Sequence, residues 1–216
     1  MHNINTLTIQ NTAFAFIDHQ PFVAFPVRSI SPDELTNNVV GLAKVARVLN
    51  IPTVLTTISA KGGPLSDPLF TQLQQVFSDV DPIDRRNTNA WSDPAFVAAV
   101  EATGRRNLVL CGLWTEVCLL QTVLSTLAAG YAIWFVSDAS GGVSVEAHLD
   151  AKQRMIQAGA RPATWQAIMA ELCPDSTSEE YQRLYPVVAE HGGGVAYAVQ
   201  YAIAQMQHRA GTGVLA

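Results

Sequence analysis

Charged side chains are scarce in this sequence: they make up 14% of its 216 residues, against 49% hydrophobic residues. Basic residues are fewer than acidic ones, with 13 Lys and Arg against 18 Asp and Glu, which gives a net charge of −5. Nucleic-acid binding needs a basic surface that neutralises phosphates, so we predict no nucleic-acid partner. So apolar a chain indicates large buried contacts between subunits, and we expect a homo-oligomer.

Long hydrophobic runs are missing as well. No uninterrupted stretch reaches the roughly 18 apolar residues of a spanning helix, so we predict no membrane partner. The first residues, MHNINTLTIQNTAF, lack the basic and apolar regions of a signal peptide. The three cysteines, an odd number, provide no disulfide framework. We therefore expect the protein in the reducing cytoplasm.

The sequence does contain apolar strands that alternate with helical segments. Continuous apolar strands of this kind are typical of a parallel sheet covered on both faces. We predict one α/β domain spanning residues 1–216, with a helical tail over about 178–216 that makes oligomer contacts. The predicted strands are 13–17, 52–58, 82–84 (a weak pattern), 108–111, 131–136 and 161–164. The predicted helices are 31–49, 69–76, 93–103, 118–129, 144–158, 178–190 and 195–207.

Parallel sheets bind ligands at the carboxyl ends of their strands, so the polar residues that follow each strand are candidates. Cys118 follows the fourth strand and begins a predicted helix, whose macrodipole would lower the pKa of its thiol. The alternative is a small buried hydrophobe, which is how we interpret Cys111 and Cys173. The other residues past strand ends are Asp18, Ser59, Lys61, Arg85, Arg86 and Asp138.

Asp18 could act as a general base toward the Cys118 thiol and then as an acid toward the leaving group. Its alternative role is a turn residue at a strand end. His19 is adjacent, but successive strand residues point to opposite faces, so a His–Cys pair is less favoured. Arg85 or Arg86 would supply a permanent cation that favours both charged forms. A solvated surface pair is the alternative for the arginines.

Five short motifs, in the order in which they occur along the chain, resemble those of one protein family. They are Phe16-Ile17-Asp18-His19-Gln20, Asn89-Ala90-Trp91, Gly112-Leu113-Trp114-Thr115-Glu116-Val117-Cys118, Val136-Ser137-Asp138-Ala139-Ser140-Gly141-Gly142 and Gln157-Ala158-Gly159-Ala160. This ordered set, over about residues 13–173, resembles the isochorismatase-like cysteine hydrolases, and within them the YcaC-type branch. The resemblance implies a three-layer α/β/α sandwich, Rossmann-like in topology, and an octamer of stacked rings.

The resemblance also implies an Asp–Lys–Cys triad. The family's aspartate falls on Asp18 and its cysteine on Cys118, while its lysine has no match. The lysines present are Lys44, Lys61 and Lys152. The YcaC-type branch tends to carry arginine before the Asn-Ala-Trp phrase, and we assign that position to Arg85 rather than Arg86. A cis peptide between Leu113 and Trp114 is implied too, with an oxyanion hole formed by the N–H groups of Trp114 and Cys118.

The substrate pocket and its ligands are less distinct in the sequence. Phe22, Phe25, Trp91 and Trp114 could line an aromatic pocket for a small molecule, or be ordinary core or subunit contacts. Nicotinamidases in this family hold a metal with an aspartate and nearby histidines, a spacing that this sequence lacks. No glycine fingerprint for a dinucleotide or phosphate follows a strand. We predict no metal and no cofactor.

Three functions fit these observations. The first is a cysteine-dependent hydrolase of a small amide or related C–N substrate that works through a thioester acyl-enzyme. The second is a vinyl-ether hydrolase acting on an isochorismate-like compound, for which the cysteine is dispensable. The third is a non-catalytic thiol sensor or binding protein that has kept the pocket.

Overall fold

The computed structural model describes residues 6–63 and 67–211. Its centre is a six-stranded sheet in the order β3-β2-β1-β4-β5-β6, in which every pairing between neighbours is parallel. The predicted parallel sheet is therefore confirmed. The strands are β1 (Thr12–Ile17), β2 (Thr53–Ile58), β3 (Ile83–Arg85), β4 (Asn107–Gly112), β5 (Ala132–Val136) and β6 (Arg161–Ala163).

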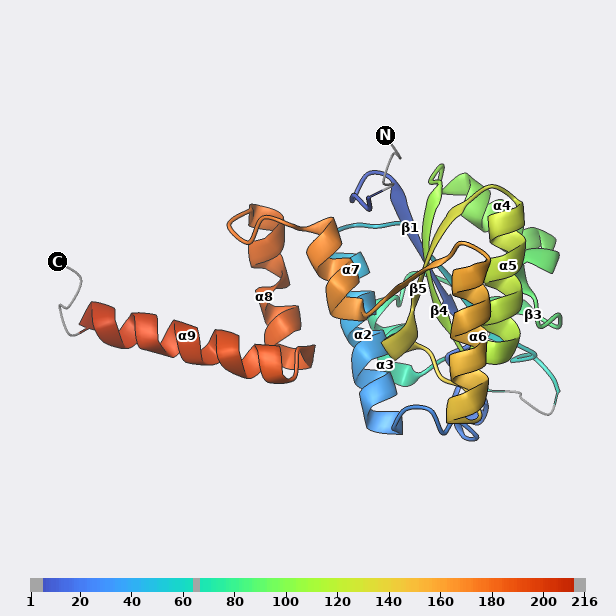
Figure 1. Ribbon diagram of the computed structural model, residues 1–216, viewed down its shortest axis with the longest axis horizontal. Helices are drawn as coiled ribbons and strands as arrows, with labels where there is room; N and C mark the ends of the chain where they lie inside the picture. The colour runs from blue at the N-terminus through green and yellow to red at the C-terminus, as the bar shows by residue number, and fades with distance from the viewer. Residues whose placement is uncertain (1–5, 64–66, 212–216) are drawn as a thin grey trace.

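Helices cover both faces of the sheet (Figure 1). On one face lie α2 (Pro32–Val48), α3 (Thr71–Val76) and α7 (Trp165–Leu172), and on the other α4 (Pro94–Ala102), α5 (Leu120–Ala128) and α6 (Val145–Gln157). This is the three-layer α/β/α arrangement that the resemblance implied. The central strands are mostly apolar because both faces of the sheet are covered, and all six residues of β1 and of β4 are buried.

Helix starts follow the capping residues in the sequence. The Ser31 side chain accepts a hydrogen bond from the Glu34 N–H at the start of α2, and Pro32 takes the first helical position. Asp93 and Ser144 accept from backbone N–H groups in the same way at the starts of α4 and α6. These local signals fix the predicted helix starts to within a residue or two.

The sheet has its switch point between β1 and β4, which are neighbours although the chain leaves them for opposite edges. Ile17 pairs with Gly112 where both strands end. A Cβ atom on Gly112 would lie 2.6 Å from the Ile17 Cβ and 2.7 Å from its carbonyl oxygen. Only glycine lets the two strands approach this closely, and the loops that follow them begin here side by side.

Four elements differ from the sequence prediction, and one of them, α7 (Trp165–Leu172), was not among the predicted helices. The helix expected over 118–129 is a π-helical turn, Thr115–Leu119, that continues into α5. A short helix, α1 (Pro21–Ala24), follows Asp18 and has no clear sequence pattern because it is a single turn. The third strand, predicted over 82–84, is shifted by one residue and ends on Arg85 itself. Two 3-10 turns lie at Ala90–Ser92 and Ser137–Ala139.

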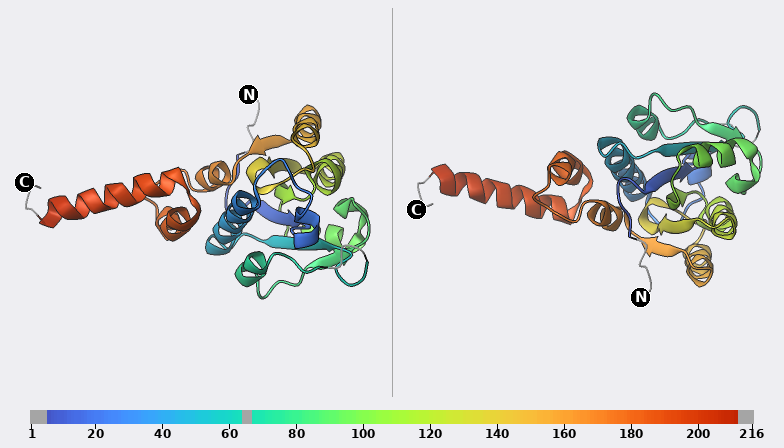
Figure 2. Two further views of the ribbon diagram at one scale, coloured as in Figure 1. Left: turned by 90° about the horizontal axis from the view of Figure 1, so that it is seen from below. Right: turned by 90° about the horizontal axis from the view of Figure 1, so that it is seen from above.

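The tail forms two helices, as predicted: α8 (Glu179–His191) packs against α2, and α9 (Gly194–Gly211) leads away from the sheet. Figures 1 and 2 show α9 extending from the body without a neighbouring element along most of its length. The glycines at 192–194 separate the helices, but Gly194 already belongs to α9. Across residues 6–63 and 67–211, no helix has both the length and the apolar character needed to cross a membrane.

Candidate active site

Three side chains that the sequence placed after different strands meet at the carboxyl edge of the sheet. Asp18 directly follows β1, Arg85 ends β3, and Cys118 lies in the π-helical turn after β4. The Arg85 guanidinium donates to the Asp18 carboxylate as an ion pair. The Cys118 thiol is hydrogen bonded to the side chains of both. These residues are called the buried trio below.

The trio is enclosed by protein. The exposed fractions of Asp18, Arg85 and Cys118 are 0%, 2% and 4%. The Thr56 hydroxyl donates to Oδ1 of Asp18 at 2.8 Å, and Arg85 also donates to the backbone carbonyl of Asn87. The parallel register pairs Ile17 with Thr56, which explains why this threonine lies beside Asp18. Every charged group in the trio therefore has a partner, as buried charges require.

Burial has a clear effect on the Asp18 carboxyl. Desolvation raises its pKa above the ordinary 3.8, while the Arg85 charge and the Thr56 hydroxyl act in the opposite direction. The burial effect is the largest of these contributions. A carboxylate with a raised pKa is a stronger base, which suits a group that must take a proton from a neighbouring thiol.

The expectation of a lowered pKa for Cys118 is wrong. Burial, with the nearby Asp18 charge as the next contribution, raises the pKa of the thiol from 9.0 to about 12. This change corresponds to about 4 kcal/mol, whereas a helix terminus contributes roughly 0.3–1 kcal/mol. Desolvation therefore outweighs the macrodipole, and the resting sulfur carries its proton. The raised pKa favours the thiol over the thiolate, so the proton has to leave as the sulfur reacts.

Arg85 rather than Arg86 is the cation in the trio. Arg86, the next residue, is exposed, because the alternation along the chain turns it to solvent. Lys61, the lysine that follows β2, is exposed as well. The register of β2 and β3 pairs Ile58 with Arg85, which brings Arg85 to the same edge as Asp18.

The contacts of the His19 ring are with residues other than Cys118. It is fully buried, with ring contacts to Phe16 and Phe70, and its Nε2 donates to the Ala139 carbonyl at 3.0 Å. Burial lowers the pKa of His19 to about 4, so the ring is neutral. The structure gives no support to a His–Cys pair here.

The loop between β4 and Cys118 contains the cis peptide that the resemblance implied, between Leu113 and Trp114. The Trp114 indole N–H donates to the Val23 carbonyl at 2.6 Å, which ties the loop to α1. The Thr115 N–H donates to the Gly141 carbonyl at 2.9 Å, which ties it to the loop after β5. The segment that carries Cys118 is thus held on two sides.

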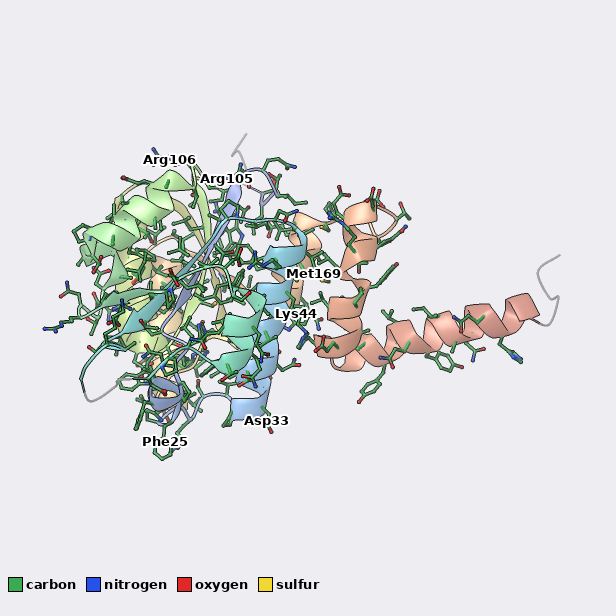
Figure 3. All side chains as sticks on the ribbon, turned by 180° about the vertical axis from the view of Figure 1, so that it is seen from behind. Phe25, Asp33, Lys44, Arg105, Arg106 and Met169 are labelled. Carbon is green, nitrogen blue, oxygen red and sulfur yellow. The ribbon has the colours of Figure 1, made fainter. Side chains whose placement is uncertain are left out.

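The four aromatic residues predicted for a pocket lie in different places. Phe22 and Phe25, in and just after α1, are 59% and 80% exposed, and Figure 3 shows Phe25 at the margin of the molecule. Trp114 is half-buried in the Cys118 loop. Trp91 instead packs edge to face on Phe96 and on Tyr131. Tyr131 directly precedes β5, at the amino ends of the strands, whereas the trio lies at their carboxyl ends. For Trp91 the structure favours the alternative, ordinary packing.

A groove of about 810 Å³ lies on the segment between β1 and α2, and its lining does not include the trio. Its wall is formed by α1 and the segment that enters α2. The lining residues are Pro21, Ala24, Phe25, Val27, Arg28, Ser29, Ile30, Ser31, Pro32 and Glu34. Among the described residues, no group of three or more His, Cys, Asp or Glu is arranged to hold a metal ion.

The remaining thiols match their interpretation as buried side chains. Cys111 is 1% exposed, with its sulfur 4.0 Å from the Ala15 carbonyl, and burial raises its pKa well above 9.0. Cys173 is 4% exposed at the end of α7, and burial raises its pKa too. Neither has an Asp and an Arg side chain as partners in the way that Cys118 has.

Sequence reasoning missed several residues around the trio. Thr56 and Asn87 contact Asp18 and Arg85, and His148 contacts the loop residue Thr115. None stands in a recognisable motif, because the contacts depend on strand register and on the packing of α6. Asp138, a strand-end candidate, accepts from the Trp165 N–H at 2.9 Å and so belongs to the start of α7.

Comparison with known proteins agrees with this arrangement. A model described as "Isochorismatase domain" matches residues 12–167. The chain is 40% identical, over 76% of its length and 79% of the relative's, to "Probable hydrolase YcaC" of Escherichia coli. It is 32% identical to bovine "Isochorismatase domain-containing protein 2", over 69% and 70% of the two chains.

Solved structures agree in fold over nearly the whole chain. YcaC from Pseudomonas aeruginosa, solved "with hexane-2,5-diol and covalent acrylamide", has a TM-score of 0.87 at 35% identity, covering 93% of this chain and 98% of that one. The Escherichia coli YcaC structure, called "an octameric hydrolase of unknown specificity", has a TM-score of 0.88 at 33% identity, covering 95% and 100%. With the domain match spanning most of the residues and the YcaC relatives aligning almost end to end, the chain belongs to the isochorismatase family of hydrolases, among its YcaC-like members.

Proposed function

We propose that this protein is a cysteine-dependent hydrolase that cleaves the C–N bond of a small amide or related molecule. One observation carries the proposal: Cys118 lies in direct contact with a buried carboxylate and a buried guanidinium. A thiol needs a base within hydrogen-bond reach, and that base needs a partner to orient it. Asp18 and Arg85 fill these two roles.

The reaction begins with the thiol proton. As the Cys118 sulfur attacks the carbonyl carbon, the proton passes to Asp18, whose raised pKa suits it to accept. The C–N bond then breaks, Asp18 returns the proton to the leaving nitrogen, and the acyl group stays on sulfur as a thioester. Water attacks the thioester, Asp18 takes one of its protons, and the acid leaves as the thiol is restored.

Arg85 and the loop backbone supply electrostatic support. Arg85 cannot move a proton near neutral pH, so it orients and stabilises the Asp18 carboxylate. We assign the oxyanion hole to the N–H groups of Trp114 and Cys118, where the loss of one donor typically costs about 10²–10³ in rate. Phe22, Phe25 and Trp114 are the proposed aromatic contacts for the substrate.

A relative supports a reactive nucleophile. The Pseudomonas aeruginosa YcaC structure contains covalent acrylamide. Acrylamide is an electrophile with an amide group, and thiolates are the protein nucleophiles that react with such reagents most readily. We take this as support for a cysteine in this chain that a small amide can reach.

The test is a screen of primary amides, carbamoyl compounds and isochorismate against the wild type and Cys118→Ala. We expect release of amine or ammonia from one amide class and a thioester adduct on Cys118 in quenched wild-type samples by mass spectrometry. Cys111→Ala serves as the control, because Cys111 is equally buried without the two charged partners. Full amidase activity in Cys118→Ala would refute the proposal.

Vinyl-ether hydrolysis of an isochorismate-like compound is the second candidate. The observation that favours it is the raised pKa of Asp18, since a buried carboxyl that keeps its proton can act as an acid toward an enol ether. In that reaction the sulfur is dispensable. Isochorismate turnover that survives Cys118→Ala and is lost in Asp18→Ala would select this function, whereas a thiol sensor would turn over neither compound.

We also propose that the protein forms a homo-oligomer through its tail. An isolated helix in water is marginally stable, and α9 presents exposed Val195, Tyr197, Tyr201 and Ile203. The Escherichia coli relative, which is octameric, aligns with 95% of this chain. Light scattering should therefore show an octamer for the full chain and a smaller species for Tyr197→Glu/Tyr201→Glu.

We keep the reducing cytoplasm as the expected compartment. Cys111, Cys118 and Cys173 are all free thiols, and Cys118 as a nucleophile has to stay reduced. Fractionation of the source cells, with detection of the native protein, tests this assignment.

A further inference from the structure

One buried histidine outside the trio contacts the turn that carries Cys118. His148 lies on α6 and is 9% exposed. Its Nδ1 is 2.9 Å from the Thr115 hydroxyl. Thr115 is fully buried and begins the π-helical turn in which Cys118 lies. The helix α6 packs against this turn, so the contact joins two elements of the same layer.

The His148 ring is neutral under ordinary conditions. Burial is the main reason that its pKa lies at about 4, and the Lys152 charge adds to it. A neutral imidazole has one acceptor nitrogen and one donor nitrogen. The Thr115 hydroxyl either donates to Nδ1 or accepts from it, so the bond persists in both tautomers.

Other contacts tie the same turn through its backbone. The Thr115 N–H donates to the Gly141 carbonyl at 2.9 Å, and the Glu116 carboxylate accepts from the Val143 N–H at 3.0 Å. Within this set, the hydroxyl of Thr115 makes a bond between two side chains, which a substitution can remove without altering the backbone contacts. The role of His148 can therefore be separated from that of the loop as a whole.

We propose that His148 is a positioning residue, which through the Thr115 hydroxyl holds the turn so that the Cys118 sulfur stays against the Asp18 carboxylate. The inference rests on the proposed function, because the position of the sulfur matters to chemistry only where it is the nucleophile. A displacement of about 1 Å at a reacting atom can cost roughly 10²-fold in rate. His148 thus contributes to reactivity without touching the substrate.

The experiment measures the second-order rate of Cys118 modification by acrylamide, a readout that needs no knowledge of the natural substrate. We expect His148→Ala and Thr115→Val each to slow modification by about tenfold or more. His148→Gln and Thr115→Ser keep a hydrogen-bonding group and should recover most of the rate. The double variant His148→Ala/Thr115→Val should be no slower than either single variant, because both remove the same bond.

His191 provides a matched control. It is also 9% exposed and its Nδ1 makes one contact, to Oδ1 of Asn37 at 3.0 Å, at the end of α8 away from the Cys118 turn. We expect His191→Ala to lower the melting temperature about as much as His148→Ala while leaving the acrylamide rate within twofold of wild type. Thr115→Val, which is nearly isosteric, keeps the test available where an alanine variant does not fold.

Two results overturn the inference. One is an unchanged acrylamide rate in both His148→Ala and Thr115→Val while wild-type Cys118 reacts faster than the other thiols. The other is equal slowing in His191→Ala, which would show a general loss of stability. Failure of the proposed function looks different: wild-type Cys118 would then react no faster than Cys111 or Cys173.

Discussion

Cys111 and Cys118 belong to one stretch of chain, the first near the end of β4 and the second in the turn that follows it. Both are buried, at 1% and 4% exposure, and burial raises both pKa values. Cys111 has a backbone carbonyl beside its sulfur, whereas Cys118 has a carboxylate and a guanidinium. In the proposed mechanism, neither burial nor pKa separates the nucleophile Cys118 from Cys111. What separates them is a proton acceptor, Asp18, held beside the sulfur of Cys118.

The strongest way to break this comparison is to remove each sulfur in turn. Cys118→Ala should lower hydrolysis of an amide found by screening by roughly 10⁴-fold or more, because the covalent step is lost. Cys111→Ala should keep the rate within a few-fold and cost only stability. Steady-state kinetics and mass spectrometry of acrylamide-treated protein measure both. Comparable losses of hydrolysis rate in the two variants would mean that Asp18 and Arg85 give Cys118 no catalytic advantage over Cys111.

Removing the cation tests whether the partners act as a set. Arg85→Met leaves the Asp18 carboxylate buried without its ion-pair partner, which should cost about 3–5 kcal/mol in the free energy of unfolding. Arg85→Lys keeps a positive charge beside Asp18 and should recover part of this loss. Arg86→Ala, at the exposed neighbouring position, should stay within about 0.5 kcal/mol of wild type. Urea denaturation of the three variants provides the values.

The close approach of β1 and β4 sharpens the comparison, because Ile17 and Gly112 meet directly before the turn that carries Cys118, whereas Cys111 lies one residue earlier within β4. Gly112→Ala places a Cβ 2.6 Å from that of Ile17, so we expect a loss of about 1–3 kcal/mol and slower acrylamide modification of Cys118. Gly194→Ala meets no atom within 4 Å and should be neutral or slightly stabilising in α9. A wild-type acrylamide rate in Gly112→Ala would contradict this prediction.

The smallest expected effect is on pH dependence. The Cys118 thiol has a pKa of about 12, so its acrylamide rate should show no thiolate plateau near neutral pH. The raised pKa of Asp18 means that this base is protonated up to a higher pH than an ordinary aspartate. The rate should therefore fall by up to about tenfold per pH unit on the acid side, beginning above pH 3.8, and Asp18→Asn should remove this limb. A plateau already complete at pH 7 would indicate a thiolate instead.

Much of the fold could be predicted because its signals are local. Apolar strands, the Ser31 capping box and glycine stops each report on a few neighbouring residues, and the predicted helices and strands lie close to their expected bounds. The short helices α1 and α7 were not predicted. The order of family phrases located Asp18 and Cys118. The sequence could not decide between a pocket role and ordinary packing for Trp91, because no local pattern distinguishes an aromatic residue that lines a pocket from one packed on Tyr131.

The chemistry of the site depended on contacts between distant segments. A sequence pattern placed Cys118 at a helix start and so indicated a lowered pKa, but the burial that raises it comes from surrounding elements. The roles of Thr56 and His148 depend on the register of β2 against β1 and on the packing of α6. No residue spacing along the chain reports either one.

By itself, the sequence determined an alternating α/β chain with an aspartate, an arginine and a cysteine after separate strands, because periodicity and capping act over a turn or a strand. The tertiary structure alone decided that these three side chains touch, that Arg85 and not Arg86 faces inward, and that the sulfur is protonated at rest. The physical reason is that ion pairing and desolvation depend on distances through space, and only the folded sheet fixes those distances.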